Sequence, residues 1–249
     1  MLAISNLNKV FNAGKPDEVV ALSGLNLQLN QSQFAVIVGA NGSGKSTLLN
    51  SIAGNVLPSS GEIKIDTTTV SSLSEHQRSR WIARVFQNPL SGTASELSIL
   101  ENFRLASLRT RSKQLSIGVN TDFRNKVRDK IAELGMGLEN KINQPMGSLS
   151  GGQRQALTLI MAVMDDVKIL LLDEPTAALD PRSAETVMKT ADKLIADYRL
   201  TAILITHNMK EAFTYGDRII QMQEGKITRD LNKIEKAKLS PSDLYEWFI

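Results

Sequence analysis

A stretch of eight residues, 39–46, has the composition of a loop that wraps around phosphate groups. It reads GANGSGKS and fits the pattern G-x-x-x-x-G-K-[ST]. Glycines let backbone N–H groups surround the phosphates, Lys45 can reach the β- and γ-phosphates, and the Ser46 hydroxyl can ligate Mg²⁺. A plain glycine-rich turn is the alternative, but the pattern stands between an apolar run and residues at helical spacing. We therefore predict a site for a nucleoside triphosphate and Mg²⁺. The predicted phosphate-binding residues are Gly39, Asn41, Gly42, Ser43, Gly44, Lys45, Ser46 and Thr47.

An apolar run at residues 169–172 ends in two acids, Asp173 and Glu174. A buried strand would deliver Asp173 beside Lys45, where its carboxylate can hold Mg²⁺ through water. Glu174 would then orient and deprotonate the water that attacks the γ-phosphate, as a general base. For such residues alone, a surface acidic pair is the alternative. Beside a phosphate loop, we predict that they complete a site that hydrolyses the triphosphate.

Residues 149–153 read LSGGQ and open a predicted helix with Ser150 as its cap. Backbone N–H groups and a hydroxyl at a helix N-terminus form an anion site. One phosphate site is already predicted in this chain, so a second suggests that the γ-phosphate is bound from two sides. The residues predicted to contribute are Ser150, Gly151, Gly152 and Gln153.

Short apolar runs predict an α/β fold with a helical region in its middle. Two alternating segments, residues 2–10 and 19–29, predict half-buried antiparallel strands. The region from about residue 88 to 164 is polar and helix-leaning, with Thr121 or Asp122 as a helix cap. Further strands are predicted at residues 34–38, 61–66, 81–86, 169–172, 202–206 and 218–222, and a helix capped by Asp180 with Pro181 in its first turn is predicted to run to about residue 198.

The composition is that of a soluble globular protein, with 42% hydrophobic and 22% charged residues among 249. Lysine and arginine number 29 against 26 acids, and the excess of +3 is too small and scattered to predict nucleic-acid binding. No cysteine occurs, which excludes disulfides and thiolate metal sites. The apolar runs are far shorter than the ~20 residues of a membrane helix. We expect a cytoplasmic protein whose membrane role would come through a partner.

With these motifs the chain resembles the nucleotide-binding subunits of the ATP-binding cassette (ABC) transporter family over essentially its whole length. The LSGGQ run matches that family's signature motif letter for letter. The resemblance implies a single ABC ATPase domain, residues 1–249, with a P-loop NTPase (RecA-like) core at residues 1–88 and 165–249. It also implies an N-terminal antiparallel β-subdomain and a helical signature subdomain at residues 89–164.

The resemblance implies roles for residues outside the three motifs. Gln87 falls where the family has its Q-loop glutamine, a ligand of Mg²⁺ and water that faces the permease. His207 matches the switch histidine that contacts the γ-phosphate, and Asp180 matches a residue that reaches the opposite protomer. Phe11 would stack on adenine, although an aromatic at a strand end is often part of the core. The predicted catalytic residues are Lys45, Gln87, Glu174 and His207, and the predicted metal ligands are Ser46, Gln87 and Asp173.

The chain departs from the commonest family pattern at three positions. Ala156 stands where importers often carry an arginine, and Ala178 replaces a serine. Asn208 follows His207 where an aspartate is usual. None of these changes removes a residue predicted to bind phosphate, bind metal or act as the base. They therefore bear on which subfamily the chain belongs to and leave the prediction of hydrolysis unchanged. The other histidine, His76, lies in a polar stretch and is expected to be exposed.

The family arrangement also implies partners. ATP would be sandwiched between the phosphate loop of one protomer and the signature of the other, in a two-fold homodimer or paired cassette. Transmembrane permease subunits and an extracytoplasmic solute-binding protein would complete an importer of a small organic solute, with this subunit on the inner face of the membrane. Residues 88–103 could receive a permease helix or pack internally as a linker. The alternatives are a cytoplasmic assembly ATPase, an exporter, and an ATPase of envelope mechanotransmission.

Overall fold

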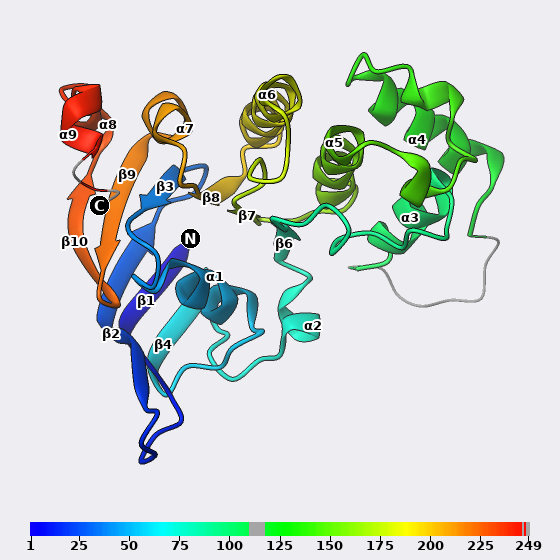
Figure 1. Ribbon diagram of the computed structural model, residues 1–249. Coiled ribbons are helices and arrows are strands. Elements are labelled where there is room, and N and C mark those ends of the chain that lie inside the picture. The colour runs from blue at the N-terminus through cyan, green and yellow to red at the C-terminus, as the bar shows by residue number, and fades with distance from the viewer. Residues whose placement is uncertain (110–117, 246, 248–249) are drawn as a thin grey trace.

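The central layer of the protein is a six-stranded sheet in the order β10-β9-β3-β8-β7-β6 (Figure 1). The computed structural model describes residues 1–109, 118–245 and 247. Five strands of the sheet are parallel and the edge strand β10 is antiparallel to β9. The strands are β3 (Phe34–Val38), β6 (Ile82–Val85), β7 (Ile169–Asp173), β8 (Thr201–Ile205), β9 (Arg218–Gln223) and β10 (Lys226–Leu231).

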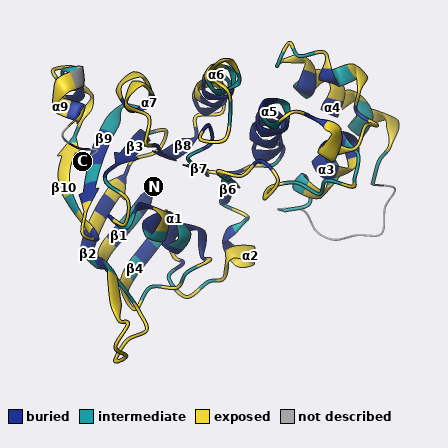
Figure 2. Cartoon of the chain, in the orientation of Figure 1, coloured by how far each residue is buried: buried dark blue, intermediate teal, exposed yellow. Residues whose placement is uncertain are grey.

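The inner strands of this sheet are buried on both faces, which explains why they are short, continuous apolar runs. In β3, Val36 and Val38 pack into one hydrophobic core while Ala35 and Ile37 pack into another. Figure 2 shows the same strands as a dark band through the middle of the molecule. Parallel strands end at the same edge of a sheet, so the segments that follow β3, β6, β7 and β8 meet there.

A second, antiparallel sheet lies on one side of the central layer, together with helix α1 (Lys45–Ala53) (Figure 1). Its strand order is β2-β1-β4-β5. Leucines and isoleucines of β1 and β2 pack with Leu48, Leu49 and Ile52 of α1 in one core. This sheet is the predicted N-terminal antiparallel β-subdomain. Its strands are β1 (Leu2–Phe11), β2 (Val19–Leu29), β4 (Ser60–Ile65) and β5 (Thr68–Thr69), and the short helix α2 (Glu75–Arg78) follows them.

A group of helices lies at the other end of the molecule, away from the antiparallel sheet (Figure 1). Described residues 86–168 form no strand beyond one isolated bridge, and on this distribution we propose the division into a core and a helical subdomain at residues 89–164. Residues 110–117 of that subdomain lie outside the described part. The helices are α3 (Ile99–Ala106), α4 (Thr121–Ala132) and α5 (Gly151–Ala162), with 3-10 turns η1 (Leu138–Asn140) and η2 (Met146–Ser148).

The predicted cap of α4 was wrong. Asn120, and neither Thr121 nor Asp122, is the N-cap, because its side chain accepts a hydrogen bond from the backbone N–H of Phe123 at 2.9 Å. Asn, Asp and Thr are all good caps, and the extended backbone of Asn120 decides among them.

The second face of the central sheet is covered by α6 (Pro181–Asp197) and α7 (Met209–Thr214), with α8 (Lys233–Lys236) and α9 (Pro241–Tyr245) beside β9 and β10. Asp180 caps α6, and Pro181 occupies its first turn, as predicted. Every predicted strand is confirmed to within one residue at each end. Among the helices in the described residues, none combines the length and apolar character that crossing a membrane would require.

Candidate functional site

The phosphate loop joins β3 to α1 at the carboxyl edge of the central sheet, as predicted. Two of its glycines are required by the space around them. A Cβ on Gly39, at φ +147°, would lie 2.2 Å from the carbonyl oxygen of Met222, and one on Gly44, at φ +98°, would lie 2.6 Å from that of Ala21. Neighbouring backbone therefore presses against the loop at both ends, and only glycine allows this approach.

Lys45, the first residue of α1, is 5% exposed and folds back over the loop. Its Nζ donates to the carbonyl oxygens of Gly39 at 2.7 Å and Ala40 at 2.9 Å. Burial lowers the pKa of Lys45, while the negative charges of Glu174 and Asp173 oppose that shift. Among the described residues, no side chain caps α1 and no acid stands in its first turn, so its N-terminal N–H groups lack a side-chain acceptor there. Asn41, Gly42 and Ser46 are exposed, Gly44 and Thr47 are half-buried, and Ser43 is buried.

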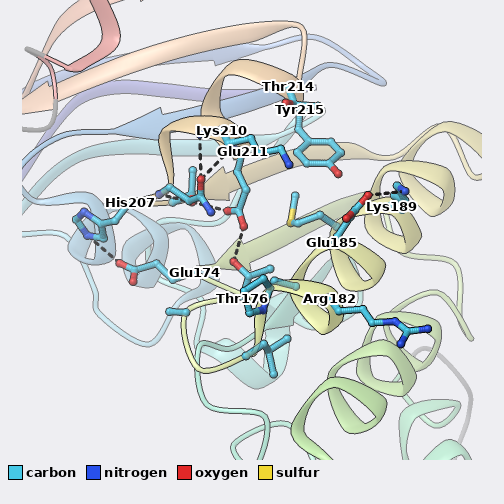
Figure 3. A pocket seen from close by; sticks show the side chains of 17 residues that line it. Glu174, Thr176, Arg182, Glu185, Lys189, His207, Lys210, Glu211, Thr214 and Tyr215 are labelled. Carbon is cyan, nitrogen blue, oxygen red and sulfur yellow. Dashed lines mark hydrogen bonds and ion pairs between the residues drawn. The ribbon is translucent and has the colours of Figure 1, made fainter. Parts of the chain in front are cut away.

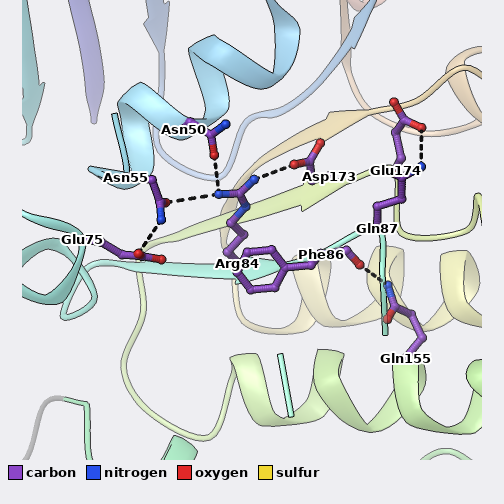
Figure 4. Close-up of polar contacts among 9 residues, drawn as sticks. All are labelled: Asn50, Asn55, Glu75, Arg84, Phe86, Gln87, Gln155, Asp173 and Glu174. Atoms are coloured by element: carbon purple, nitrogen blue, oxygen red, sulfur yellow. Dashed lines mark hydrogen bonds and ion pairs between the residues drawn. The ribbon is translucent and has the colours of Figure 1, made fainter. Parts of the chain in front are cut away.

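Two predicted catalytic residues converge on the carboxylate of a third, Glu174. His207 Nε2 lies 3.0 Å from Oε1 of Glu174, and Gln87 Nε2 lies 3.4 Å from its Oε2 (Figures 3 and 4). The three residues follow β8, β6 and β7, which explains how positions so far apart in sequence meet. Glu174 has φ +46°, a left-handed conformation that is strained for a residue with a side chain. The tight turn aims its carboxylate between the other two groups.

Asp173 pairs with a residue that the sequence analysis missed. Arg84 Nη2 lies 2.6 Å from Asp173 Oδ2, and the two side chains are only 11% and 16% exposed (Figure 4). The signal was present in the sequence as a single cation inside the apolar strand that precedes Gln87. Its meaning depended on knowing that β6 lies beside β7.

Two more buried polar residues were missed. The Gln155 side chain, in α5, donates to the carbonyl oxygens of Phe86 at 2.8 Å and Pro175 at 2.9 Å, and so ties α5 to both segments that carry Gln87 and Glu174 (Figure 4). Glu211, in α7, accepts hydrogen bonds from the hydroxyls of Thr176 at 2.6 Å and Thr206 at 2.5 Å. It lines a cavity of about 900 Å³ between α6 and α7 that also includes Glu174 and His207 (Figure 3).

The signature residues stand apart from the phosphate loop of the same chain. Ser150 caps α5, and its side chain and that of Gln153 satisfy each other's backbone N–H groups in a complete capping box. A Cβ on Gly152 would lie 2.6 Å from the Ser183 side chain, so α5 and α6 touch at this glycine. Within the described ranges, no hydrogen bond or ion pair joins residues 150–153 to residues 39–47.

The remaining predicted residues lie at the surface. Asp180 accepts from the backbone N–H groups of Arg182 and Ser183, and the Ser183 side chain and these N–H groups lower the pKa of Asp180. Phe11 ends β1 with 37% of its surface exposed, under the ammonium of Lys9 at 4.8 Å. Asn208 caps α7 through the N–H groups of Lys210 and Glu211, as an aspartate at this position would.

The donor groups present suit Mg²⁺. This ion prefers oxygen ligands and takes one or two carboxylates together with phosphate oxygens and water. Ser46 offers an exposed hydroxyl and Asp173 a carboxylate from the same sheet edge, and Gln87 adds an amide oxygen. A parallel sheet that carries a phosphate loop and two strand-end acids at its carboxyl edge defines a P-loop nucleotide hydrolase.

The comparisons with known proteins place this hydrolase in a family. The family model described as "ABC transporter" matches residues 22–177. The chain therefore belongs to the ABC transporter family, as the resemblance predicted, and it is an ATP-binding subunit that hydrolyses ATP.

Individual relatives align with nearly the whole length of this chain. It is 37% identical to a tyrosine transport ATP-binding protein of Clostridioides difficile (strain R20291), covering 100% of this chain and 98% of the relative. It is 34% identical to a phosphonates import ATP-binding protein of Ruegeria sp. (strain TM1040), covering 92% and 88%. A macrolide export ATP-binding/permease protein of Bartonella quintana (strain Toulouse) matches at 33%, covering 96% of this chain and 35% of the relative.

A solved dimer of an ATP-binding cassette in a post-hydrolysis state, with ADP and Pi bound, superposes with a TM-score of 0.80. It is 29% identical and covers 94% of this chain and 99% of that structure. The predicted fold class is thereby confirmed, and the bound products agree with an ATPase.

Proposed function

We propose that this chain drives a membrane importer of a small organic solute, working as a dimer on a partner permease. The observation that supports the ATP-driven part of this proposal is the convergence of Gln87 and His207 on the carboxylate of Glu174. Lys45 lies in the phosphate loop at the same edge of the sheet. Hydrolysis of a terminal phosphate requires a base for water and fixed positive or donor groups for the developing charge, and these residues supply both.

The phosphate loop and the first turn of α1 would bind the β- and γ-phosphates. Backbone N–H groups and the ammonium of Lys45 are the donors, and the open N-terminus of α1 adds the positive end of the helix dipole. Ser46, Asp173 and Gln87 would hold Mg²⁺, which neutralises phosphate charge when bound. Phe11 would stack on the adenine through the part of its ring that is exposed, since the Lys9 ammonium lies over the ring at 4.8 Å.

Glu174 would act as the general base. Its carboxylate has two oxygens, and each already has one protein contact, from His207 and from Gln87. These contacts hold the carboxylate where a water can donate to it. His207 is 37% exposed, so its ring can also reach a γ-phosphate.

The second side of the ATP site would come from another copy of the chain. Ser150, Gly151, Gly152 and Gln153 have no bond to their own phosphate loop in the described part of the structure. In a two-fold dimer each α5 N-terminus would instead close on the partner's γ-phosphate, with Asp180 at the same interface. Loss of the γ-phosphate on hydrolysis would open the dimer and so drive the permease.

An amino acid is the solute class that fits the relatives best. The tyrosine transport protein matches over 98% of its length, which leaves no room for an attached permease, whereas the macrolide export protein continues well beyond the matched region. We propose that transmembrane permease subunits are separate chains, that an extracytoplasmic solute-binding protein delivers the solute, and that this subunit lies on the inner face of the membrane.

The first experiment tests the motor. The purified chain should hydrolyse Mg-ATP, and Glu174→Gln should lower turnover by about 10²- to 10⁴-fold while ATP binding stays, because an amide cannot take the proton of the attacking water. Light scattering should show that Glu174→Gln with ATP accumulates as a dimer. Turnover at the wild-type level in this variant would remove Glu174 from the base role.

The second experiment tests the direction of transport. The permease that co-purifies with the chain is reconstituted in proteoliposomes with radiolabelled tyrosine and ATP on the side of this subunit. Import predicts accumulation of tyrosine on the same side as ATP, dependent on an active Glu174. The macrolide export relative favours the opposite direction as the second candidate, and accumulation of tyrosine or of a macrolide on the far side would establish it.

A further inference from the structure

The ion pair between Arg84 and Asp173 links the predicted magnesium ligand to three other segments. Arg84 lies in β6 opposite Leu171 of β7, and its side chain runs along the strand to the acid at the strand's end. The contact from Nη2 to Oδ2 is 2.6 Å. With side-chain exposures of 11% and 16%, the pair is largely shielded from water, where a charged hydrogen bond is stronger than at the surface.

The guanidinium is itself held from several sides. Its Nη1 donates to Oδ1 of Asn50 at 2.7 Å and to Oδ1 of Asn55 at 3.2 Å. Its Cζ lies 4.7 Å from the centre of the Phe86 ring (Figure 4). Asn50 belongs to α1, the helix that begins at the phosphate loop, and Phe86 directly precedes Gln87. Arg84 therefore joins the phosphate helix and the strand before Gln87 to the acid at the end of β7.

Only one oxygen of Asp173 is used in this pair. Among the described residues, Arg84 is the side chain that pairs with Asp173, and it does so through Oδ2. A carboxylate fixed by one oxygen cannot rotate freely about its last bond, so the direction of the other oxygen is set as well. The guanidinium fork, with Nη1 on the asparagines and Nη2 on the acid, provides this constraint, whereas a single ammonium would not.

We propose that Arg84 is a positioning residue for the magnesium site: it fixes Oδ2 of Asp173 and thereby directs Oδ1 toward Mg²⁺ and its water. The proposal rests on the role of Asp173 under the proposed function. The positive charge of Arg84 also repels the metal. We expect this repulsion to be outweighed by the orientation that Arg84 gives to the carboxylate of Asp173. Orienting partners of metal ligands change metal affinity by about 10- to 100-fold when removed.

The test measures metal binding apart from catalysis. Arg84→Met keeps a long unbranched side chain and removes every donor. Mn²⁺ binding, followed by electron paramagnetic resonance with the non-hydrolysable analogue AMP-PNP, should weaken by about 10-fold or more. Binding of AMP-PNP in EDTA should change by less than about twofold, because the phosphate contacts are untouched. Arg84→Lys keeps the charge without the fork and should restore less than half of the lost affinity on a logarithmic scale.

Arg78 provides the matched control. It is fully buried and donates to carbonyl oxygens of Ser51, Ile52, Ser71 and Leu73, with no bond to a predicted site residue. Arg78→Met should lower the melting temperature at least as much as Arg84→Met and leave Mn²⁺ affinity unchanged. If Arg84→Met does not fold, Asn50→Ala removes one anchor and should weaken Mn²⁺ in the same direction by a smaller factor.

Unchanged or tighter Mn²⁺ binding in a folded Arg84→Met, or in Asn50→Ala where Arg84→Met is unfolded, would overturn the positioning role. Full rescue by Arg84→Lys would replace it with a simple charge effect and overturn it too. These failures differ from failure of the proposed function. If the wild-type chain with AMP-PNP bound no Mn²⁺, the magnesium assignment of Asp173 would fall, and this inference with it.

Discussion

Two helix N-termini in this protein carry glycine-rich sequences that suit anions, and they are built in opposite ways. The α1 N-terminus has Gly44 as its cap residue, at φ +98°, with no side-chain cap. The α5 N-terminus has Ser150, at φ −62°, and a complete capping box with Gln153. The first leaves its donors to a ligand. The second satisfies two of its donors, the N–H groups of Ser150 and Gln153, within the chain.

Under the proposed function, this difference would let one chain hold ATP before it meets a partner. The α1 end already contains a buried cation, Lys45, and lies at the sheet edge with both strand-end acids. The α5 end needs no anion for its stability and is held by Gln155 and by contact with α6. We therefore expect α1 to set the affinity for ATP and α5 to set dimerisation and turnover.

Loss of the α1 cation is the largest effect that this comparison predicts. Lys45→Ala should weaken ATP binding by at least about 100-fold, since it removes a charged donor from the phosphates in a site shielded from water. Isothermal titration calorimetry measures it directly. Lys168→Ala, which removes an exposed lysine paired with Asp66, is the control and should bind ATP normally. Near-normal ATP affinity in Lys45→Ala would contradict the claim that the α1 N-terminus sets the affinity for ATP.

Loss of the α5 cap hydroxyl should act on the dimer and spare ATP affinity. In the Glu174→Gln background, Ser150→Ala should weaken the ATP-dependent dimer by about 10- to 100-fold for each of its two ATP sites, the value of one hydrogen bond to a charged group at each site. ATP affinity of the monomer should stay within about twofold. Light scattering over a range of protein concentrations gives the dimer constant.

Ser98 allows the stability effect of a lost cap to be subtracted. It caps α3 with the same kind of capping box, formed with Glu101, and lies outside the predicted ATP site. Ser98→Ala and Ser150→Ala should each lower the free energy of unfolding by about 1 kcal/mol. Only Ser150→Ala should disturb the dimer. Equal dimerisation in the two variants would show that Ser150 serves as a helix cap alone.

Features that depend on neighbouring residues in the chain could be predicted from the sequence. The strands around the site were predicted to within one residue because buried parallel strands are continuous apolar runs, as at β3 and β7. Spacing predicted the phosphate loop, and the resemblance supplied Gln87 and His207, which contact Glu174. These predictions use signals that lie close together in the chain.

Residues that act across strands could not be predicted in this way. Arg84 and Asp173 are 89 positions apart, and Thr176 and Glu211 are 35 apart. Their pairing depends on which strands and helices become neighbours, and a sequence pattern within one segment does not contain that information. The wrong cap of α4 has a related cause. Three adjacent residues could all cap a helix, and the extended backbone conformation at Asn120 selects this residue.

The smallest predicted effect concerns the contact with the base of the nucleotide. It tests further whether the α1 N-terminus, and not another part of the chain, sets the affinity for ATP. If the phosphate loop dominates affinity, Phe11→Ala should weaken ATP binding by only about 2- to 10-fold, the range expected for one aromatic contact. Binding of inorganic triphosphate should be unaffected, since it has no ring to stack. Val20→Ala, an exposed apolar residue on the neighbouring strand, is the control. A loss as large as that of Lys45→Ala would mean that base stacking and not the α1 N-terminus sets how tightly a single chain holds ATP.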